Sequence, residues 1–575
     1  MEKEKINLEG GKAVTQHHGN TIDTVKNNKY FWFFLLLAIP LAFYMRFVFF
    51  SVFGSDDLAY AKNALDIANG NFKTQAHPFY NRIGLILPVA ILYKLFGFNE
   101  YISMVYPFLC SLINIGLVFI SGALFFNIRV GILAVILLSF LPLDVALSTI
   151  LIPDLPASTF ISICSIIFLY CEMRSVKWES ILYFISGLSI GWAYLTKEYS
   201  LFFGIFLFVY VAISVFKKRA KFGWIYLGIG ILLPIMTELT YYFFKTGNIL
   251  YRIHAIETTH NVSVWSGIHY HGYTLLKRMF FDLLNVLLEN RVFGFNFFFV
   301  FAGMTLVILE KRKQKELWYF VLWFGVMFLS LNFCPTSLKS YNLLQLVDRY
   351  MYLFICPSII LSGYYLNRLY EEIQLKRLYI LSRKLIISLA VPLIVMIIFN
   401  IVKHSLSDIV FISIIILAIS ILYLLPFIQY SCTKWFGLGI VGLFVFFNIA
   451  PSIYMTLRHL INNPCNGRNI SAFIKELPPK LIYADDRTKS ILEYLDGFKK
   501  NIKIESFYEK NVNEIGNSYV IVDKDYLFYA NKIYQKEMPS FLDHPPRHWN
   551  ILKHFNTIEN YGCTIYEVGD KIFSK

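Results

Sequence analysis

Charged residues are scarce in this chain of 575 residues. Lysine, arginine, aspartate and glutamate together make up 16%, while 57% of the residues are hydrophobic. Soluble domains carry about 25% charged residues. The scarcity excludes an ordinary soluble protein and predicts an integral membrane protein.

Closely paired cysteines are also lacking. None of the eight cysteines belongs to a Cys-x-x-Cys pair, so no metal-binding framework is indicated. Cys465 and Cys563 bracket a polar C-terminal region. They can form a disulfide if that region is extracytoplasmic, and the sequence leaves this bond open.

The net charge of +15 raises the question of nucleic-acid binding. However, the basic residues fall in short clusters between apolar runs, of which Lys217–Lys221 and Lys311–Lys315 are the clearest. Such clusters are typical of loops that set the orientation of membrane helices. We therefore expect no nucleic acid among the partners.

Thirteen apolar runs are long enough to cross a bilayer, which takes roughly 20 residues. They begin near Tyr30, Tyr101, Arg129, Asp154, Trp178, Tyr199, Phe222, Arg291, Glu316, Arg349, Lys384, Leu406 and Phe436. A further run, Ile83–Gly97, is short and contains Pro88 and Lys94, which indicates an interfacial or re-entrant segment. The predicted fold class is a polytopic α-helical membrane protein.

Charge placement gives the predicted orientation. With thirteen spans and the N-terminus inside, the basic clusters fall in the cytoplasm, as the positive-inside rule requires; a fourteenth span would place them outside. The predicted division is a cytoplasmic tail at 1–29, a transmembrane domain at 30–457 and an extracytoplasmic domain at 458–575. Outer loops are expected at 54–100 and 245–290, in a multi-pass protein of the plasma membrane.

The last of these regions changes character. Short apolar runs at 480–484, 502–506, 518–523 and 563–568 are typical of strands, and 488–498 has a helical pattern. We expect a small α/β domain.

Two adjacent carboxylates, Asp56 and Asp57, follow the first span directly. Apolar residues then recur at spacings of three and four, which predicts an amphipathic helix along the interface. Ser55 or Asp56 can simply cap that helix. The alternative is a general base that takes a proton from an attacking hydroxyl or amine. Together, the two carboxylates can also help to hold a divalent cation such as Mg²⁺ or Mn²⁺.

Another acidic residue, Asp154, lies where the third and fourth spans meet on the outer side. It can be an N-cap, with Pro156 in the first turn of the next helix. Its placement on the same side as Asp56 favours a role in the same site.

Cations accumulate on this side as well. Lys197, Arg349, Arg82 and His77 all lie at outer junctions or loops. Charges at such places often only reach toward lipid headgroups. If they converge, they form a phosphate site in which arginine binds two oxygens. Arg46 lies inside the first span and is expected to face the protein interior.

These motifs and their order resemble the GT-C class of integral-membrane glycosyltransferases, which includes aminoarabinose transferases, protein O-mannosyltransferases and enzymes that decorate lipopolysaccharide cores. The resemblance spans about 30–370. It rests on Arg46, Ser55-Asp56-Asp57-Leu-Ala-Tyr-Ala, His77-Pro78, Asp154, Gly191-Trp-Ala-Tyr-Leu-Thr-Lys197 and Asp348-Arg349-Tyr350. His77-Pro78-Phe79 departs from the usual Lys/Arg-Pro-Pro.

The resemblance implies a polyprenyl-phosphate sugar as donor and an extracytoplasmic acceptor, with inversion at the anomeric carbon. It implies Asp56 as catalytic base, assisted by Asp57 and Asp154. Lys197 and Arg349 would hold the lipid phosphate, and we add Arg82 and His77 as candidates.

Two other functions stay open. A secondary transporter would place ionisable residues mid-span and often shows internal repeats, and no repeat is evident here. Another enzyme that uses a polyprenyl carrier, such as a glycan ligase, fits the same charges.

Overall fold

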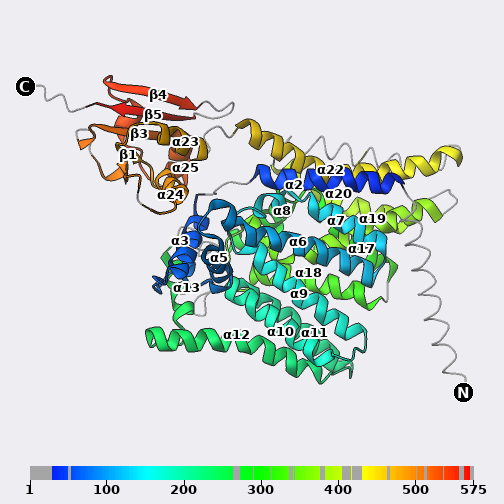
Figure 1. Ribbon diagram of the computed structural model, residues 1–575. Coiled ribbons are helices and arrows are strands. Elements are labelled where there is room, and N and C mark those ends of the chain that lie inside the picture. The colour runs from blue at the N-terminus through cyan, green and yellow to red at the C-terminus, as the bar shows by residue number, and fades with distance from the viewer. Residues whose placement is uncertain are drawn as a thin grey trace, which may run out of the picture.

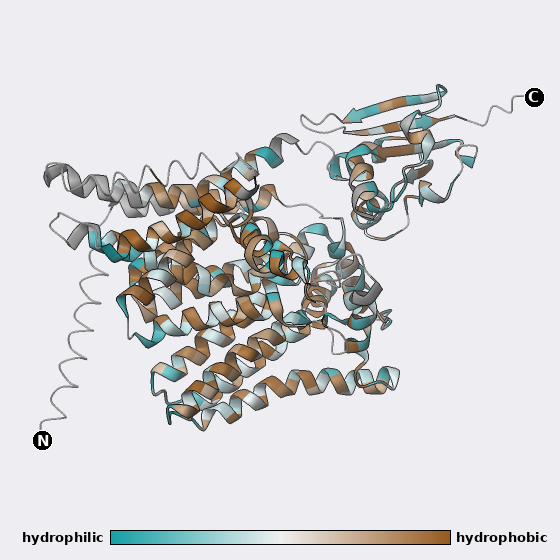
Figure 2. Ribbon diagram, turned by 180° about the vertical axis from the view of Figure 1, so that it is seen from behind, coloured by the Kyte–Doolittle hydropathy of each residue, from teal (hydrophilic) through white to brown (hydrophobic). Residues whose placement is uncertain are grey.

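The computed structural model describes most of the chain. The described residues are 29–49, 54–262, 272–288, 290–311, 314–335, 341, 343–375, 383–403, 416, 430–462, 467–499, 501–510, 514–534, 536–555 and 562–569. They form a large helical bundle and a smaller C-terminal region that contains a sheet (Figure 1). Apolar residues dominate the bundle, whereas the C-terminal region mixes polar and apolar residues (Figure 2).

Within the described part of the chain, five helical segments are long and apolar enough to cross a membrane. They are α6 (Glu100–Phe125), α9 (Asp154–Met173), η1 with α11 (Glu198–Phe216), α12 (Gly223–Thr246) and α18 (Lys315–Phe333). Further bundle helices are α2 (Lys29–Val48), α7 (Ile128–Ser139), α8 (Pro142–Leu147), α10 (Glu179–Thr196), α17 (Asn296–Glu310), α19 (Ile355–Leu375), α20 (Arg383–Lys403) and α22 (Tyr430–Asn462). The predicted span near Leu406 lies almost wholly outside the described residues, and the count of thirteen stays a prediction.

Shorter elements gather at one end of the bundle (Figure 1). They are α3 (Asp56–Ala68), α4 (Pro78–Asn81), α5 (Ile83–Phe96) and α13 (Tyr251–Val262). The α5 helix has 14 residues, about 21 Å, which is too short for a hydrocarbon core of about 30 Å. The expectation of a short, non-spanning segment here is consistent with this length. Beyond α13 follow α14 (Tyr273–Lys277), the π-helical turn η2 (Arg278–Asp282), α15 (Leu283–Leu287) and α16 (Asn290–Phe293).

Glycines bring α10 and α12 into close contact. A Cβ atom added at Gly187 would lie 2.2 Å from the carbonyl oxygen of Leu227, and one at Gly230 would lie 2.3 Å from that of Phe184. Small residues at such a crossing are typical of membrane helix pairs, because they let the two backbones approach. The close crossing positions α10 against α12, and Lys197 directly follows the last residue of α10.

Arg46 is buried at 2% exposure, as expected. Its guanidinium pairs with Asp144 of α8 and donates to the Ser139 carbonyl at 2.8 Å. Tyr352 donates to the other oxygen of Asp144. A buried charge with a complete set of partners is a structural anchor between α2 and the bundle core.

The C-terminal region contains a five-stranded sheet of order β2-β1-β3-β5-β4. Strands β1 (Leu481–Ala484), β2 (Ile504–Ser506) and β3 (Ser518–Asp523) are parallel, while β4 (Trp549–Phe555) and β5 (Cys563–Val568) are antiparallel additions. Helices α23 (Gly467–Glu476), α24 (Asp486–Leu495) and α25 (Lys524–Tyr534), the 3-10 turn η5 (Phe507–Glu509) and α26 (Ser540–Asp543) complete it. The four predicted strands and the predicted helix are present.

Strand β4 was not predicted, because this edge strand exposes most of its side chains and lacks the apolar alternation of its neighbours. Cys465, one half of the candidate disulfide, lies outside the described residues, so that bond stays a prediction.

The C-terminal region contacts the bundle through α24. The hydroxyl of Tyr494 donates to Ser103 at 2.8 Å, and its ring meets that of Phe98 edge-on. Arg468 of α23 pairs with Glu100 at 2.9 Å. These contacts hold α24 against α3 and the start of α6.

Candidate active site

The two carboxylates at the start of α3 point in different directions. Asp57 is buried and accepts hydrogen bonds from the backbone amides of Ser55, at 2.8 Å, and Gly54, at 3.3 Å. Ser55 occupies the N-cap position without a side-chain cap bond. Asp56 instead accepts from Arg349 at 3.0 Å. Asp57 therefore organises the turn, and Asp56 is left to face the other charged groups.

Four of the predicted residues form a string of alternating charge. Arg349, in the 3-10 turn η3 (Asp348–Phe354), lies between Asp56 and Asp154, with its Nε 4.0 Å from Asp154 Oδ2. Asp154 in turn pairs with Lys197. Asp154 is the first residue of α9, whose N-cap is Pro153, so its side chain is not a cap. The structure thus brings Asp56, Arg349, Asp154 and Lys197 together.

Exposure differs along this string. The side chains of Arg349 and Asp56 are 26% and 19% exposed, whereas those of Lys197 and Asp154 are 1% and 0% exposed. Lys197 follows the last residue of α10, and its ammonium lies 4.0 Å from the ring centroid of Tyr350. An ammonium with a carboxylate and an aromatic face is well compensated for burial. Within this string of four residues, Asp56 and Arg349 are the ones open to a ligand.

A second string of charges meets the first. Arg82 makes a bidentate pair with Glu198, at 2.7 and 3.3 Å. Glu198 also pairs with Arg252 of α13 at 3.5 Å, and Arg252 pairs with Glu238 of α12 at 2.7 Å. Lys197 and Glu198 are neighbours in the chain, so the two strings share one turn.

Glu198, Arg252 and Glu238 were not among the predicted site residues. An acidic residue within a predicted span, as Glu238 is, was the available signal, because such residues are rare in lipid and usually paired. Tyr60, whose hydroxyl accepts from Arg82, carried no signal in the sequence.

The cations keep Asp56 ionised. Burial alone would raise the pKa of Asp56, but Arg349 and then Arg82 outweigh it and hold this pKa below its usual 3.8. For Arg82, burial acts to lower the pKa, and the Glu198 carboxylate outweighs it and raises the pKa well above its usual value. Both groups are therefore charged at neutral pH.

His77 lies at the N-cap of α4, where its Nδ1 accepts from the Phe79 amide at 3.3 Å. Burial and then the positive charge of Arg82 lower the pKa of His77 below 6.5, against the opposing effect of Asp56. A neutral His77 with Nδ1 as acceptor carries its proton on Nε2. It can donate one hydrogen bond to an anionic ligand without adding charge.

The predicted divalent-cation site uses the carboxylates of Asp56 and Asp57, but these two groups face different partners. Asp57 faces backbone amides, and Asp56 faces Arg349. Among the described residues, no group of three or more histidine, cysteine or acidic side chains is arranged to hold a metal ion. The divalent cation stays a prediction.

The chain is similar to known proteins in part of its sequence and in its fold. The family model for dolichyl-phosphate-mannose-protein mannosyltransferases matches residues 85–242. The structure of ArnT from Cupriavidus metallidurans bound to undecaprenyl phosphate is similar with a TM-score of 0.54 at 14% identity, over 94% of this chain and 99% of that one. The apo structure gives 0.52 at 13% identity over the same shares. This chain has the GT-C fold.

The GT-C fold accounts for the helical bundle. An archaeal oligosaccharyltransferase, AglB from Archaeoglobus fulgidus, is similar at a TM-score of 0.45 and 13% identity, over 81% of this chain and 60% of that one. No curated protein sequence matches the chain. The likeness to ArnT, at 13% and 14% identity, establishes the fold alone, and the roles of the charged residues rest on their own geometry.

Proposed function

We propose that the protein transfers a sugar, with inversion, from a polyprenyl-phosphate donor to an extracytoplasmic acceptor. The observation that carries this proposal is the accessible pair of Asp56 and Arg349 at the end of a GT-C bundle. A carboxylate beside a guanidinium supplies both groups that the reaction needs. One removes a proton from the nucleophile, and the other stabilises the departing phosphate.

The donor phosphate is expected to contact Arg349 and Arg82. Both are arginines, which can bind two phosphate oxygens at once, and both keep some exposure, at 26% and 11%. His77 would donate a further hydrogen bond. Lys197 is buried and paired, so we propose that it acts through Asp154, which orients Arg349.

Arg349 links donor binding to the base. Its guanidinium donates a hydrogen bond to the carboxylate of Asp56 at 3.0 Å. A phosphate that takes over this guanidinium would release Asp56 to accept the proton of the acceptor. Asp57 assists by fixing the turn that presents Asp56. The leaving phosphate is a stable anion and needs no second acid.

The proposed orientation places this site outside the cytoplasm. The basic turn Lys217–Lys221 between α11 and α12 lies at the opposite end of the bundle from α3 (Figure 1). By the positive-inside rule that turn is cytoplasmic. Residues 30–457 would then form the transmembrane transferase domain in the plasma membrane, and 458–575 an outer α/β domain.

The test compares the wild type with one substitution, in sugar transfer and in the lipids that copurify with the protein. Asp56→Asn keeps the size of the side chain and a contact for Arg349, but it removes the base. We expect transfer to fall by about 10²- to 10⁴-fold while the donor lipid is retained. Mass spectrometry of lipids that copurify from native membranes should show a polyprenyl-phosphate sugar enriched in this variant.

Asp66→Asn is the matched control, because Asp66 lies on the same helix in an exposed pair with Lys62. It should transfer sugar normally. Full activity of Asp56→Asn would refute the assignment of the base. A variant that retains only bulk phospholipid, and does not bind added polyprenyl phosphate, would refute the donor class.

A further inference from the structure

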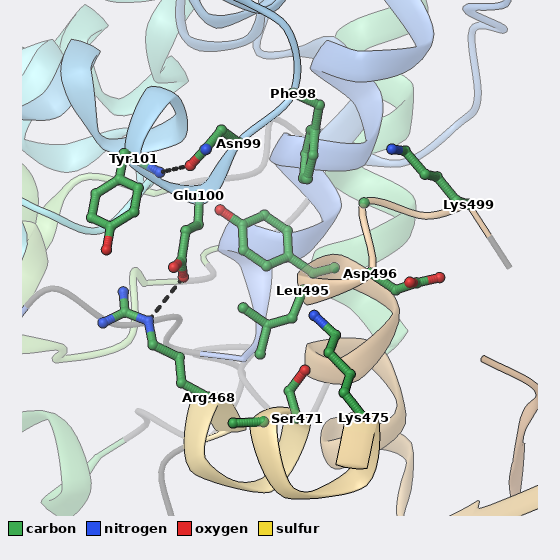
Figure 3. A pocket seen from close by; sticks show the side chains of 13 residues that line it. Phe98, Asn99, Glu100, Tyr101, Arg468, Ser471, Lys475, Leu495, Asp496 and Lys499 are labelled. Carbon is green, nitrogen blue, oxygen red and sulfur yellow. Dashed lines mark hydrogen bonds and ion pairs between the residues drawn. The ribbon is translucent and has the colours of Figure 1, made fainter. Parts of the chain in front are cut away.

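A pocket of about 480 Å³ lies where the C-terminal region meets the bundle. Its walls come from α23, from the end of α24 and from the turn between α5 and α6 (Figure 3). Its polar and aromatic lining includes Glu100, Tyr101, Arg468, Lys475, Tyr494 and Lys499. None of the proposed catalytic or phosphate-binding residues lines it, so it is a separate site.

The pocket has an excess of positive charge. Glu100 accepts from Arg468 at 2.9 Å, and Asp496 accepts from the Asn501 amide at 2.9 Å. Within the described residues, by contrast, neither Lys475 nor Lys499 makes an ion pair. In Figure 3 the paired Glu100 and Arg468 lie on one side, and the two lysines lie on the other with Asp496 between them, so that three basic side chains face two acidic ones. Two ammonium groups beside one cavity indicate an anionic ligand.

The depth of the pocket relative to the membrane follows from α6, a candidate membrane span that begins at Glu100, because Glu100 and Tyr101 line the pocket. The pocket is therefore at the level where a span leaves the hydrocarbon and enters the headgroup layer. Tyr101, which is 53% exposed, lies at this boundary, where tyrosine is commonly found.

Exposed apolar side chains lie on α5 and α6, the two helices joined by the turn that lines the pocket. Leu95 and Phe96 at the end of α5 are 69% and 68% exposed. Along α6, Leu109, Ile113 and Ile120 lie near one face of the helix and are 48%, 45% and 50% exposed. Exposed apolar residues on a spanning helix have lipid as their natural neighbour. Acyl chains can thus lie directly beside a cationic pocket.

We propose that this pocket binds the phosphate-bearing headgroup of an anionic membrane lipid, whose acyl chains lie along the apolar surface of α5 and α6. Lys475 and Lys499 neutralise the phosphate, and Arg468, held by Glu100, borders it. Because α24 also packs against α3, a lipid bound here would hold the C-terminal region against the helix that carries Asp56. The proposal does not rest on the proposed function.

The experiment uses the purified full chain and native mass spectrometry with long-chain phosphatidylglycerol as the probe. The test variant is Lys475→Gln/Lys499→Gln. The control is Lys489→Gln/Lys503→Gln, which removes two lysines from the same region outside the pocket. Each lysine near a membrane surface contributes about 1 kcal/mol of attraction to anionic lipid. The dissociation constant should therefore rise about 25-fold in the test variant and stay unchanged in the control.

Two further arms separate a lipid from a free anion. Leu95→Ser/Phe96→Ser should weaken phosphatidylglycerol binding without changing the binding of inorganic phosphate. Inorganic phosphate should bind much more weakly than the lipid. Equal lipid affinity in the lysine variant and its control would overturn the proposal. Inorganic phosphate that binds as tightly as phosphatidylglycerol would show a free-anion site and would also overturn it.

Discussion

The pair of Lys197 and Asp154 gives the sharpest test of the charge network. Both side chains are almost completely buried, at 1% and 0% exposure. Removing one partner of such a pair leaves a buried charge uncompensated and costs about 3–5 kcal/mol. Lys197→Met should lose up to this much, since Asp154 keeps Arg349 Nε at 4.0 Å. Asp154→Asn should lose a similar amount, because Lys197 then loses its carboxylate and keeps the rings of Tyr350 and Tyr199.

The double substitution should cost much less than the sum of the two. Replacing a buried pair by neutral groups of similar size is often close to neutral. Some loss is expected, since Arg349 gives up a carboxylate 4.0 Å away and keeps Asp56 at 3.0 Å. The coupling energy between the two positions should then be at least about 3 kcal/mol, at the upper end of measured values.

The assay is the free energy of unfolding in bicelles by steric trapping, measured for the wild type, both single variants and the double variant. Lys62 and Asp66 supply the control cycle, because they form an exposed pair at 45% and 28%. Their coupling should be about 0.3–0.5 kcal/mol. Additive losses at Lys197 and Asp154 would refute the claim that these residues compensate each other in the interior.

Two other predictions concern stability elsewhere in the molecule. Burial and the nearby Asp485 carboxylate raise the pKa of Asp523 from 3.8 to about 6, so the ionised side chain lowers stability as pH rises through 6. Asp523→Asn should stabilise the sheet by up to about 3 kcal/mol above pH 6 and little at pH 4, as hydrogen exchange of β3 and α25 would show; a gain independent of pH would contradict this. Gly187→Ala should cost about 1–3 kcal/mol of stability, because its Cβ would lie 2.2 Å from a carbonyl oxygen. Gly204→Ala is the control and should be neutral, because nothing lies within 4 Å of its Cβ. Equal melting temperatures for the two variants would contradict the close crossing of α10 and α12.

The elements of the fold were largely predictable from hydrophobic runs and their breaks. The short run with Pro88 and Lys94 forms the 14-residue helix α5, and its interfacial or re-entrant position stays a prediction. Strand β4 was missed because its side chains are mostly exposed, so its sequence has no alternation to detect. Such an edge strand is specified by pairing with β5, which a local pattern does not contain.

The members of the charged cluster were predictable only in part, because Glu198, Arg252 and Glu238 were not among the predicted residues, and the geometry was not predictable. The family resemblance predicted Asp56 as the base and Asp57 as its assistant, but the folded turn is needed to show that Asp57 faces backbone amides while Asp56 faces Arg349. Side-chain direction at a helix start depends on the turn before it and on what packs opposite. Arg349 is 293 positions away from Asp56 in the chain, so no local pattern joins them.

The network also explains why so many charges can be placed together at the end of an apolar bundle. Four acidic groups, Asp56, Asp154, Glu198 and Glu238, alternate with four basic ones, Arg82, Lys197, Arg252 and Arg349. Each buried charge has an opposite neighbour, which offsets the cost of desolvation. Under the proposed function, a donor phosphate would bring negative charge to Arg349, and Asp56, the most exposed of the four carboxylates, would be the one released. In that proposal the charge that the donor adds and the base that the reaction requires are coupled through one residue, Arg349.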